Sequence, residues 1–363
     1  MRIAYVSLHW PRTRNSGVGK KIQAQMGAWI AMGHEVRLFM HTANHEPQSD
    51  LLEADTFFYA ATGKIKTEIN RAHAMARMIA AIRDFQPDVI YLRYGIYVYP
   101  AHRLMDIAPV VEELTTNDLS QHEGLGRVYS LYNRLTRGII ISRTSGLVCL
   151  SDELANSPFN AVFQKPTRVI GDGIDMEKIQ PFPAPNNIQP QLVFIGSPGS
   201  PWQGVDKLLF LAHAFPDMGI HIIGYDHIDG VNSLPDNIKL YGYLKTEEYR
   251  EILAGMDCAI GSLALHRIKL NESSPLKTRE CLALGLPMVL PYKDTDLDDL
   301  ECDFLLKIPN KEDNIRTHAQ AIYDFTCQMH GHRVERDQIV HLDQAGKELK
   351  RTAFFQEILA VIR

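Results

Sequence analysis

The feature that most constrains the fold is an alternation repeated along the chain. Short runs rich in β-branched and aromatic residues are followed by longer segments in which apolar residues recur at helical spacing. Between the first two runs, Ile22, Met26, Trp29 and Ile30 have this spacing, and Gly33 follows where a helix should end. In the first half the predicted strands are residues 3–8, 35–40, 89–92, 110–113 and 147–150. The pattern predicts a parallel sheet wrapped by helices.

The alternation restarts after a Pro-rich segment, residues 181–190, which is typical of an interdomain linker. Strands are predicted in the second half at residues 192–196, 221–223, 239–241, 258–260, 288–290 and 304–307. A length of 363 residues suits two domains. We therefore predict an α/β protein with two Rossmann-like doubly wound domains, residues 1–175 and 176–346, and an amphipathic helix at 347–363. Ligands of such sheets bind at the carboxyl ends of the strands, so the site is expected in a cleft between the domains.

Composition excludes several classes of protein. The sequence has no apolar run of about 18 residues that could span a membrane, and its five cysteines form no Cys-x-x-Cys pair. We expect reduced cysteines, a cytoplasmic protein and no metal site. Residues 1–173 contain 19 Lys and Arg against 16 Asp and Glu, whereas the remainder is acidic. This bias favours an anionic substrate or an acidic membrane surface and is too weak to indicate nucleic acid.

The loop after the first strand has features of an anion site. Glycines at Gly17 and Gly19 allow backbone N–H groups to approach a ligand, and Lys20 and Lys21 stand at the positive end of the next helix. The loop does not match a P-loop, and Ile22 replaces the third glycine of a dinucleotide fingerprint. The alternative is an ordinary strand-to-helix turn with solvated lysines.

The most informative segment is residues 266–287. Ser274 followed by Pro275 predicts a helix start, in which the serine caps the free N–H groups and the proline takes the first helical position. Gly285 predicts the end of the helix about three turns later. Lys277 then lies in the first turn, with Glu280 three residues further on the same face. Such a helix end could bind a phosphate through its N–H groups, its dipole and the lysine, while Glu280 could accept hydrogen bonds from ribose hydroxyls.

These residues resemble a known family. The Glu-x7-Glu spacing of Glu272 and Glu280, the run from Ser274 to Lys277 and the exit from Gly285 to Pro287 are similar to the donor site of family 4 glycosyltransferases of the GT-B fold. Further similar segments are Gly17, residues 33–36, 171–175 and 202–206. The resemblance implies that the helix at 347–363 packs back on the first domain.

The resemblance also implies roles for individual residues. Lys277 and the helix start, formed by Ser274, Pro275 and Leu276, would bind the donor diphosphate. Glu280 would bind the ribose, Glu272 would lie near the transferred sugar, and Gly17 would bring N–H groups to the phosphate or sugar. Transfer with retention is expected, without a metal or cofactor, because cations and N–H groups can neutralise the diphosphate.

The sequence departs from the family pattern at two places. Where the family commonly has Arg and Lys on the diphosphate, this chain has Ser197 and Gln203. We predict Arg267 and Lys269 as replacements, the alternative being solvated loop charges. The family histidine expected after residue 113 is also missing. On the acceptor side the candidates are His9, Lys20, Asp118 and His122, each of which could instead be a capping or surface residue.

The sequence therefore predicts a glycosyltransferase of surface polysaccharide or glycan synthesis. Its expected partners are a UDP- or GDP-sugar and a carbohydrate or lipid-linked acceptor. Residues 64–83 and 127–143 carry basic residues beside apolar ones, as helices lying at the inner face of a membrane do, although ordinary outer helices share this pattern. The alternatives are a nucleotide-sugar epimerase or hydrolase and a catalytically silent nucleotide-sugar-binding protein.

Overall fold

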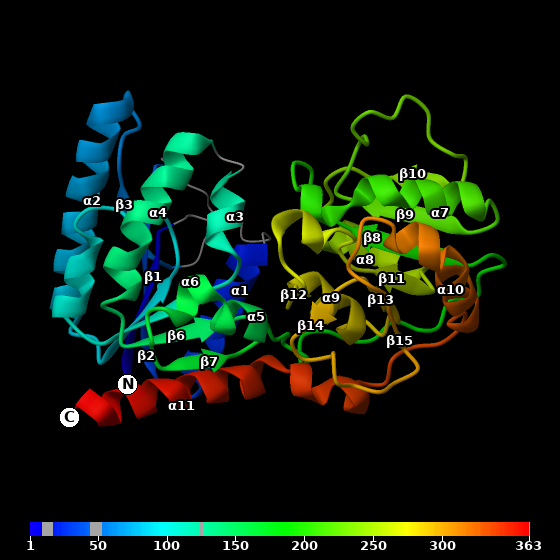
Figure 1. Cartoon of the computed structure of the whole chain (residues 1–363). Coiled ribbons are helices and arrows are strands. Elements are labelled where there is room, and N and C mark those ends of the chain that lie inside the picture. Colours follow the sequence, from blue (N-terminus) through cyan, green and yellow to red (C-terminus); the bar gives the residue numbers. More distant parts are fainter. Residues whose placement is uncertain (9–16, 44–52, 124–125, 363) are drawn as a thin grey trace. The chain divides into compact units, whose positions relative to one another are not determined.

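The computed structural model describes residues 1–8, 17–43, 53–123 and 126–362 (Figure 1). The chain divides into two compact units: unit 1 comprises Met1–Gly171 and Gln344–Arg363, and unit 2 comprises Asp172–Asp343. Each unit is a parallel sheet with helices, which confirms the predicted α/β class with two doubly wound domains. None of the helices in the described residues has the length and apolar character needed to cross a bilayer.

Unit 1 contains a seven-stranded parallel sheet in the order β3-β2-β1-β4-β5-β6-β7. The strands are β1 (Arg2–Ser7), β2 (Glu35–Thr42), β3 (Asp55–Phe58), β4 (Val89–Arg93), β5 (Val110–Leu114), β6 (Gly146–Cys149) and β7 (Thr167–Val169). The helices are α1 (Gly17–Ala31), α2 (Lys64–Phe85), α3 (Asp118–Glu123), α4 (Arg127–Ile141), α5 (Asp152–Asn156), α6 (Pro158–Ala161) and α11 (Gln344–Ile362). The sequence predicted the five inner strands and missed the two edge strands, β3 and β7.

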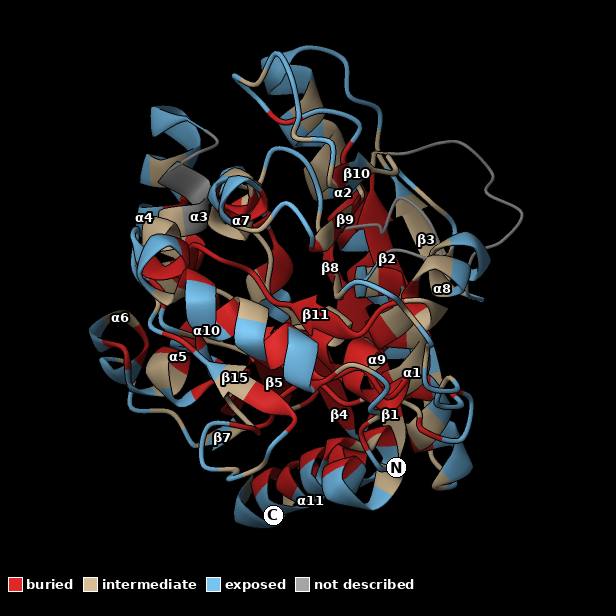
Figure 2. Ribbon diagram, turned by 90° about the vertical axis from the view of Figure 1, so that its right-hand side faces the viewer, coloured by how far each residue is buried: buried red, intermediate tan, exposed pale blue. Residues whose placement is uncertain are grey.

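Helices cover both faces of this sheet. The residues of β1 are therefore packed against helices on both sides. Ala4 and Val6 pack with α2, whereas Ile3 and Tyr5 point to the opposite face, where α1 and α11 lie. Figure 2 shows the buried residues concentrated in the strands and on the inner sides of the helices. A strand buried on both faces needs apolar residues at every position.

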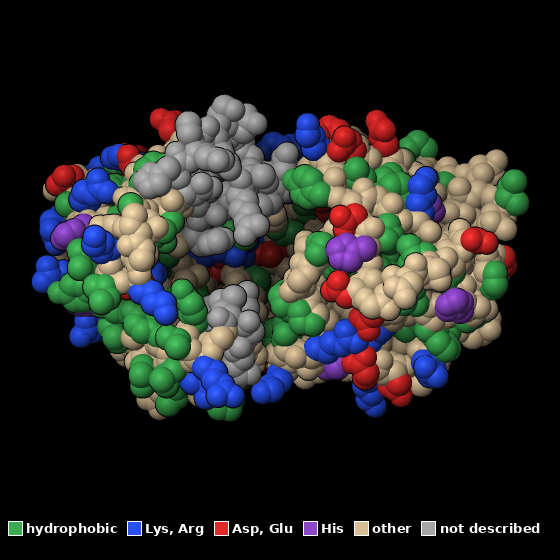
Figure 3. Space-filling view, turned by 90° about the horizontal axis from the view of Figure 1, so that it is seen from above, with side chains coloured by type: hydrophobic (Ala, Val, Ile, Leu, Met, Phe, Trp, Pro, Cys, Tyr) green, Lys and Arg blue, Asp and Glu red, His purple; other side chains and the backbone are tan. Residues whose placement is uncertain are grey.

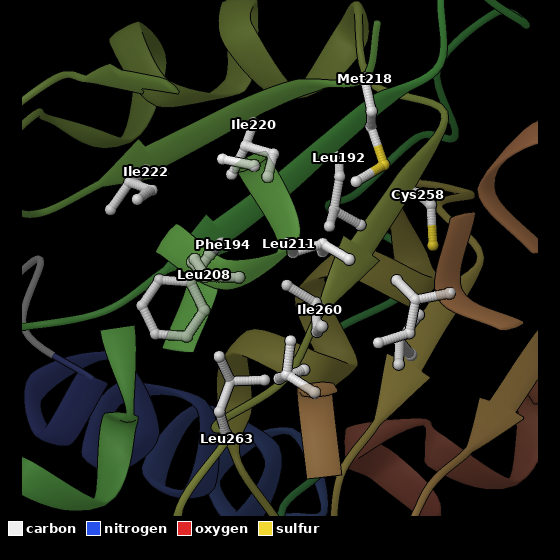
Figure 4. Packing of buried hydrophobic residues seen from close by; sticks show 14 of the residues in the cluster. Leu192, Phe194, Leu208, Leu211, Met218, Ile220, Ile222, Cys258, Ile260 and Leu263 are labelled. Atoms are coloured by element: carbon white, nitrogen blue, oxygen red, sulfur yellow. The ribbon is translucent and has the colours of Figure 1, made fainter. Parts of the chain in front are cut away.

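Unit 2 contains a six-stranded parallel sheet in the order β10-β9-β8-β11-β13-β15 and a two-stranded sheet, β12-β14. The strands are β8 (Gln191–Ile195), β9 (Gly219–Ile223), β10 (Ile238–Leu240), β11 (Cys258–Ile260), β12 (Glu272–Ser273), β13 (Met288–Leu290), β14 (Lys293–Asp294) and β15 (Leu305–Lys307). The helices are α7 (Leu208–Ala214), α8 (Thr246–Ala254), α9 (Leu276–Ala283) and α10 (Asn314–Gln328). Its core joins the strands to α7 and α10, with Phe194, Leu211 and Ile260 at its centre (Figure 4).

A buried network of charged residues joins α11 to the rest of unit 1. Glu348 of α11 accepts a hydrogen bond from Trp29 Nε1 (2.7 Å) and pairs with Arg351. Glu113, at the end of β5, pairs with Lys21 (3.0 Å) and accepts a hydrogen bond from Tyr91 Oη (2.7 Å). Trp29 and Phe355 also pack edge to face, with ring centroids 5.7 Å apart. The helix at the end of the chain thus completes the core of unit 1.

Glu113 is ionised although it is fully buried. Burial alone would raise the pKa of its carboxyl group, but Lys21, Arg93 and Arg351 together lower it to about 2. The stability that this charge contributes is therefore present above the unfolded pKa of 4.5 and is lost as the pH falls toward 2.

We expect Glu113→Gln to lower the free energy of unfolding by about 3–5 kcal/mol, because two buried cations, Lys21 and Arg351, and the partly buried Arg93 lose the charge that compensates them. Urea denaturation at pH 7, followed by far-UV circular dichroism, measures this loss. The matched control is Glu357→Gln, since Glu357 pairs with Arg168 (2.6 Å) at the exposed surface of α11 and should contribute less than about 1 kcal/mol. Equal losses in both variants would contradict the prediction.

Candidate functional site

The candidate site of unit 2 lies at the carboxyl end of β8. Chain order runs outward from β8 through β9 to β10 on one side, whereas β11 continues on the other, so the strand order reverses between β8 and β11. Ligands of open α/β sheets bind at this kind of switch point. Lys277 of α9 reaches it: its Nζ donates hydrogen bonds to the carbonyl oxygen of Ile195 (2.8 Å) and to Gln203 Oε1 (2.8 Å).

The surroundings of Lys277 make its positive charge costly. Its Nζ lies 4.8 Å from the centroid of the Phe194 ring, and burial lowers the pKa of the ammonium group to about 7. Within the described residues, no Asp or Glu forms an ion pair with this nitrogen. Gln203 also accepts a hydrogen bond from Ser262 Oγ (3.3 Å), in the segment after β11, which holds its amide in place. A desolvated cation among neutral acceptors would be stabilised by an anionic ligand.

The start of α9 differs from the prediction. Pro275 is the extended residue that precedes the helix, which begins at Leu276, and no side chain caps it. Ser274 Oγ instead accepts a hydrogen bond from the N–H of Asp172 (2.7 Å), so the predicted serine cap is wrong. The first helical hydrogen bonds run from Thr278 and Arg279 to the Pro275 carbonyl (3.1 and 3.4 Å). The amides of Leu276 and Lys277 therefore have no acceptor within the helix. Gly285, with φ of 88°, ends the helix as predicted.

Glu280 lies on α9 one turn after Lys277 and is held by α8. Tyr249 Oη lies 2.8 and 2.9 Å from the two carboxylate oxygens, and Arg250 Nη2 lies 3.3 Å from Oε1. Burial and the neighbouring Glu280 raise the pKa of Tyr249, which keeps its hydroxyl protonated as a donor. These contacts orient the carboxylate of Glu280. Sequence reasoning missed Tyr249.

A buried arginine joins the segment of Glu272 to α9. Glu272 lies in β12, opposite Lys293 of β14, and is partly exposed. Arg279 is fully buried; it pairs with Asp294 of β14 and donates to Asp296 (2.7 Å) and to the carbonyl oxygen of Asp172 (3.0 Å). Sequence reasoning missed Arg279 as well, since only the fold brings its partners together.

Arg267 is engaged by protein carboxylates. It forms a bidentate pair with Asp206 (2.9 and 2.8 Å) and two further hydrogen bonds with Glu312. Lys269 is exposed and adopts a left-handed conformation with φ of 56°. Diphosphate binding by these two residues stays a prediction, but Arg267 would have to exchange a carboxylate for the ligand. Gln203, which replaces the family lysine, is the residue in direct contact with Lys277.

The predicted site residues of unit 1 differ in how far they are buried. Gly17 is the exposed first residue of α1, and Lys20 is partly exposed in the same turn. Asp118 is buried and accepts hydrogen bonds from Tyr94 (2.9 Å), Asn133 (2.7 Å) and Arg137 (3.0 Å), so its contacts join α3 to α4. His122 belongs to α3, but its side chain, like His9, lies outside the described part of the chain. In that part no three His, Cys, Asp or Glu side chains are arranged to bind a metal.

Comparison with known proteins gives one family match and many fold matches. The family model of Glycosyltransferase Family 4 matches residues 16–178, whereas no curated protein is similar in sequence. Sucrose-phosphate synthase from Thermosynechococcus elongatus has a TM-score of 0.74 at 12% identity, over 99% of both chains. The apo lipopolysaccharide outer core galactosyltransferase WaaB has a TM-score of 0.70 at 10% identity, over 98% of this chain and 100% of that one. An α-glucosyltransferase in complex with UDP and a mismatched 13-mer DNA has a TM-score of 0.66 at 15% identity, over 98% and 100%.

The family model matches unit 1 from α1 to β7 and leaves out β1, whereas the fold matches extend over both units. Both findings agree with the resemblance seen in the sequence. The chain thus has the GT-B fold of these glycosyltransferases, and its residues 16–178 match the family model of Glycosyltransferase Family 4.

Proposed function

We propose that the chain transfers a sugar from a nucleoside-diphosphate sugar to an acceptor, as a hexosyltransferase. The observation that carries the proposal is the Lys277 ammonium group, desolvated at the carboxyl end of β8 and bound only to neutral acceptors in the described residues. A diphosphate placed there would accept hydrogen bonds from the amides of Leu276 and Lys277 and would pair with this cation. The UDP complex of an α-glucosyltransferase with the same fold supports a uridine nucleotide as the first donor to test.

Each site residue has a proposed task in this reaction. Lys277 and the first turn of α9 stabilise the diphosphate leaving group, and Glu280, oriented by Tyr249, binds the ribose. Glu272 is assigned to the transferred sugar, and a role for Gly17 in binding the phosphate or sugar stays a prediction. The work is positioning and electrostatic stabilisation of an oxocarbenium-like transition state, for which these residues require no metal. Transfer with retention follows from the family resemblance.

The acceptor and the cellular setting remain predictions. A carbohydrate or lipid-linked acceptor of polysaccharide synthesis, in the cytoplasm or at the inner face of a membrane, is our first choice. The sequence predicts no nucleic-acid partner, yet one protein of the same fold was solved with DNA. Duplex DNA therefore belongs among the acceptors to be assayed, and its glycosylation would show that prediction to be wrong.

A panel of UDP- and GDP-sugars, incubated with and without glycan and lipid-linked acceptors, separates the proposed function from its alternatives. We expect nucleoside diphosphate to be released only when an acceptor is present, measured by chromatography of the nucleotides. Donor consumed without an acceptor would indicate an epimerase or hydrolase. Binding without turnover of any donor would indicate a silent relative.

Lys277→Met is expected to weaken nucleoside-diphosphate binding by about 10- to 100-fold, because a charge-assisted contact is lost. The free protein should keep its melting temperature, since an apolar side chain replaces a desolvated cation. Isothermal titration calorimetry and thermal shift measure the two quantities. Lys311→Met, at an exposed lysine of the same unit, is the matched control and should bind normally. Unchanged affinity in Lys277→Met would exclude the ammonium group from the site.

The pH dependence of binding tests the same group. In the free protein Lys277 loses its proton near pH 7, but an anion prefers the protonated form, so binding must take up a proton above this pH. The dissociation constant for UDP should therefore rise by up to about tenfold per unit between pH 7.5 and 9.5, a range above the titration of the nucleotide phosphate. Lys277→Arg, which stays charged, should give a flat profile. A flat profile in the wild-type chain contradicts the lowered pKa.

A further inference from the structure

Helix α4 of unit 1 presents an apolar stripe to solvent. Val128, Leu131, Tyr132 and Leu135 have the spacing i, i+3, i+4, i+7, which in most helices marks the side that packs on a core. Here these residues are 80%, 59%, 37% and 72% exposed. A single exposed leucine is ordinary, but a complete stripe of this kind indicates an interaction surface.

The orientation of α4 is determined by its buried polar side. Arg137 donates to Asp118 Oδ1 (3.0 Å) and to Asn160 Oδ1 (2.8 Å), and Asn133 Nδ2 donates to Asp118 Oδ2 (2.7 Å). Rolling the helix to bury its apolar side would expose these groups to solvent and break a buried ion pair. The exposed stripe is therefore a built feature of the fold.

The first turns of α2 extend the apolar surface. Two adjoining cavities of about 790 and 580 Å³ lie along α2. Both are lined by Lys64 and Glu68 of α2 and by Tyr132 of α4. The exposed apolar residues of this region are Ile65, Ile69, Tyr99, Val128, Tyr129, Leu131, Tyr132 and Leu135, which we call the α2–α4 surface. In Figure 3 hydrophobic side chains of unit 1 gather beside Lys and Arg side chains.

The charge around this surface is positive. The flanking turns, residues 61–73 and 126–135, contain five Lys or Arg and one carboxylate, Glu68, which pairs with Arg71 (2.8 Å). Lys64 and Arg127 line the larger cavity and are exposed, and within the described residues neither forms an ion pair. A partner must therefore offer apolar contact and negative charge together.

We propose that the α2–α4 surface docks unit 1 on an anionic phospholipid bilayer. Val128, Leu131 and Leu135 enter the boundary between headgroups and acyl chains, as the apolar side of an interfacial helix does. The tyrosines suit the interface because their rings are apolar and their hydroxyls polar. Lys64 and Arg127 lie at the level of the lipid phosphates, where each cation contributes to binding.

Co-sedimentation of the full chain with vesicles of phosphatidylcholine, with and without 30% phosphatidylglycerol, tests this surface. We expect binding to the anionic vesicles only, weakened by raising the salt concentration. Val128→Ser with Leu135→Ser should lower the partition coefficient at least about tenfold, and Lys64→Ala with Arg127→Ala by a similar factor. Ile188→Ser with Val340→Ser, which removes two exposed apolar residues of unit 2, should bind as the wild type does.

Two outcomes would overturn the proposal. One is a failure of the sedimentation test. In that case the wild-type chain stays in the supernatant with anionic vesicles at low salt, or the serine variant binds the vesicles as strongly as the wild type does. The other is a dimer in analytical ultracentrifugation that Val128→Ser with Leu135→Ser dissociates, because the stripe would then be a contact between copies of the chain. All variants should keep the thermal shift caused by UDP, so failure of membrane docking is distinguishable from failure of the donor site.

Discussion

The candidate site depends on one contact, the hydrogen bond from Lys277 Nζ to the carbonyl oxygen of Ile195. It joins the first turn of α9 to the end of β8, at the position where the strand order of unit 2 reverses. Since the Phe194 ring and neutral acceptors surround the ammonium group, the protein keeps a cation where solvation is poor. Proteins retain such groups when a ligand supplies the missing charge, as the phosphates of a nucleotide would. Glu280, oriented by Tyr249, lies one turn further along α9 and extends the same polar surface.

Much of the fold could be predicted because inner strands of a parallel sheet are buried on both faces and therefore read as apolar runs. The two strands missed in unit 1, Asp55–Phe58 and Thr167–Val169, are short edge strands that are largely not buried, so their sequences carry no such signal. The predicted helix after Pro275 was right within a residue, and Gly285 ended it as expected. The serine cap was wrong because a distant backbone amide, that of Asp172, competes for the Ser274 hydroxyl.

The site was predictable where its residues are near in sequence. Lys277 and Glu280 share one helix, so spacing alone places them on one face. Tyr249 comes from α8, thirty-one positions before Glu280, and Glu312 is forty-five positions from Arg267, so neither partner can be read from local pattern. The engagement of Arg267 by Asp206 and Glu312 shows the limit of reasoning from charge, because a cation near the right motif can already be paired within the protein.

The position of α11 has a consequence for how the protein is made. Trp29 and the residues around Glu113 belong to the first third of the chain, yet their partners Glu348, Arg351 and Phe355 are among its last twenty residues. During synthesis on the ribosome, the apolar face and the buried acid of the first sheet therefore stay uncovered until residues 344–362 have emerged. Until then the nascent chain exposes apolar surface that favours aggregation, and a product without α11 would be more open to proteolysis.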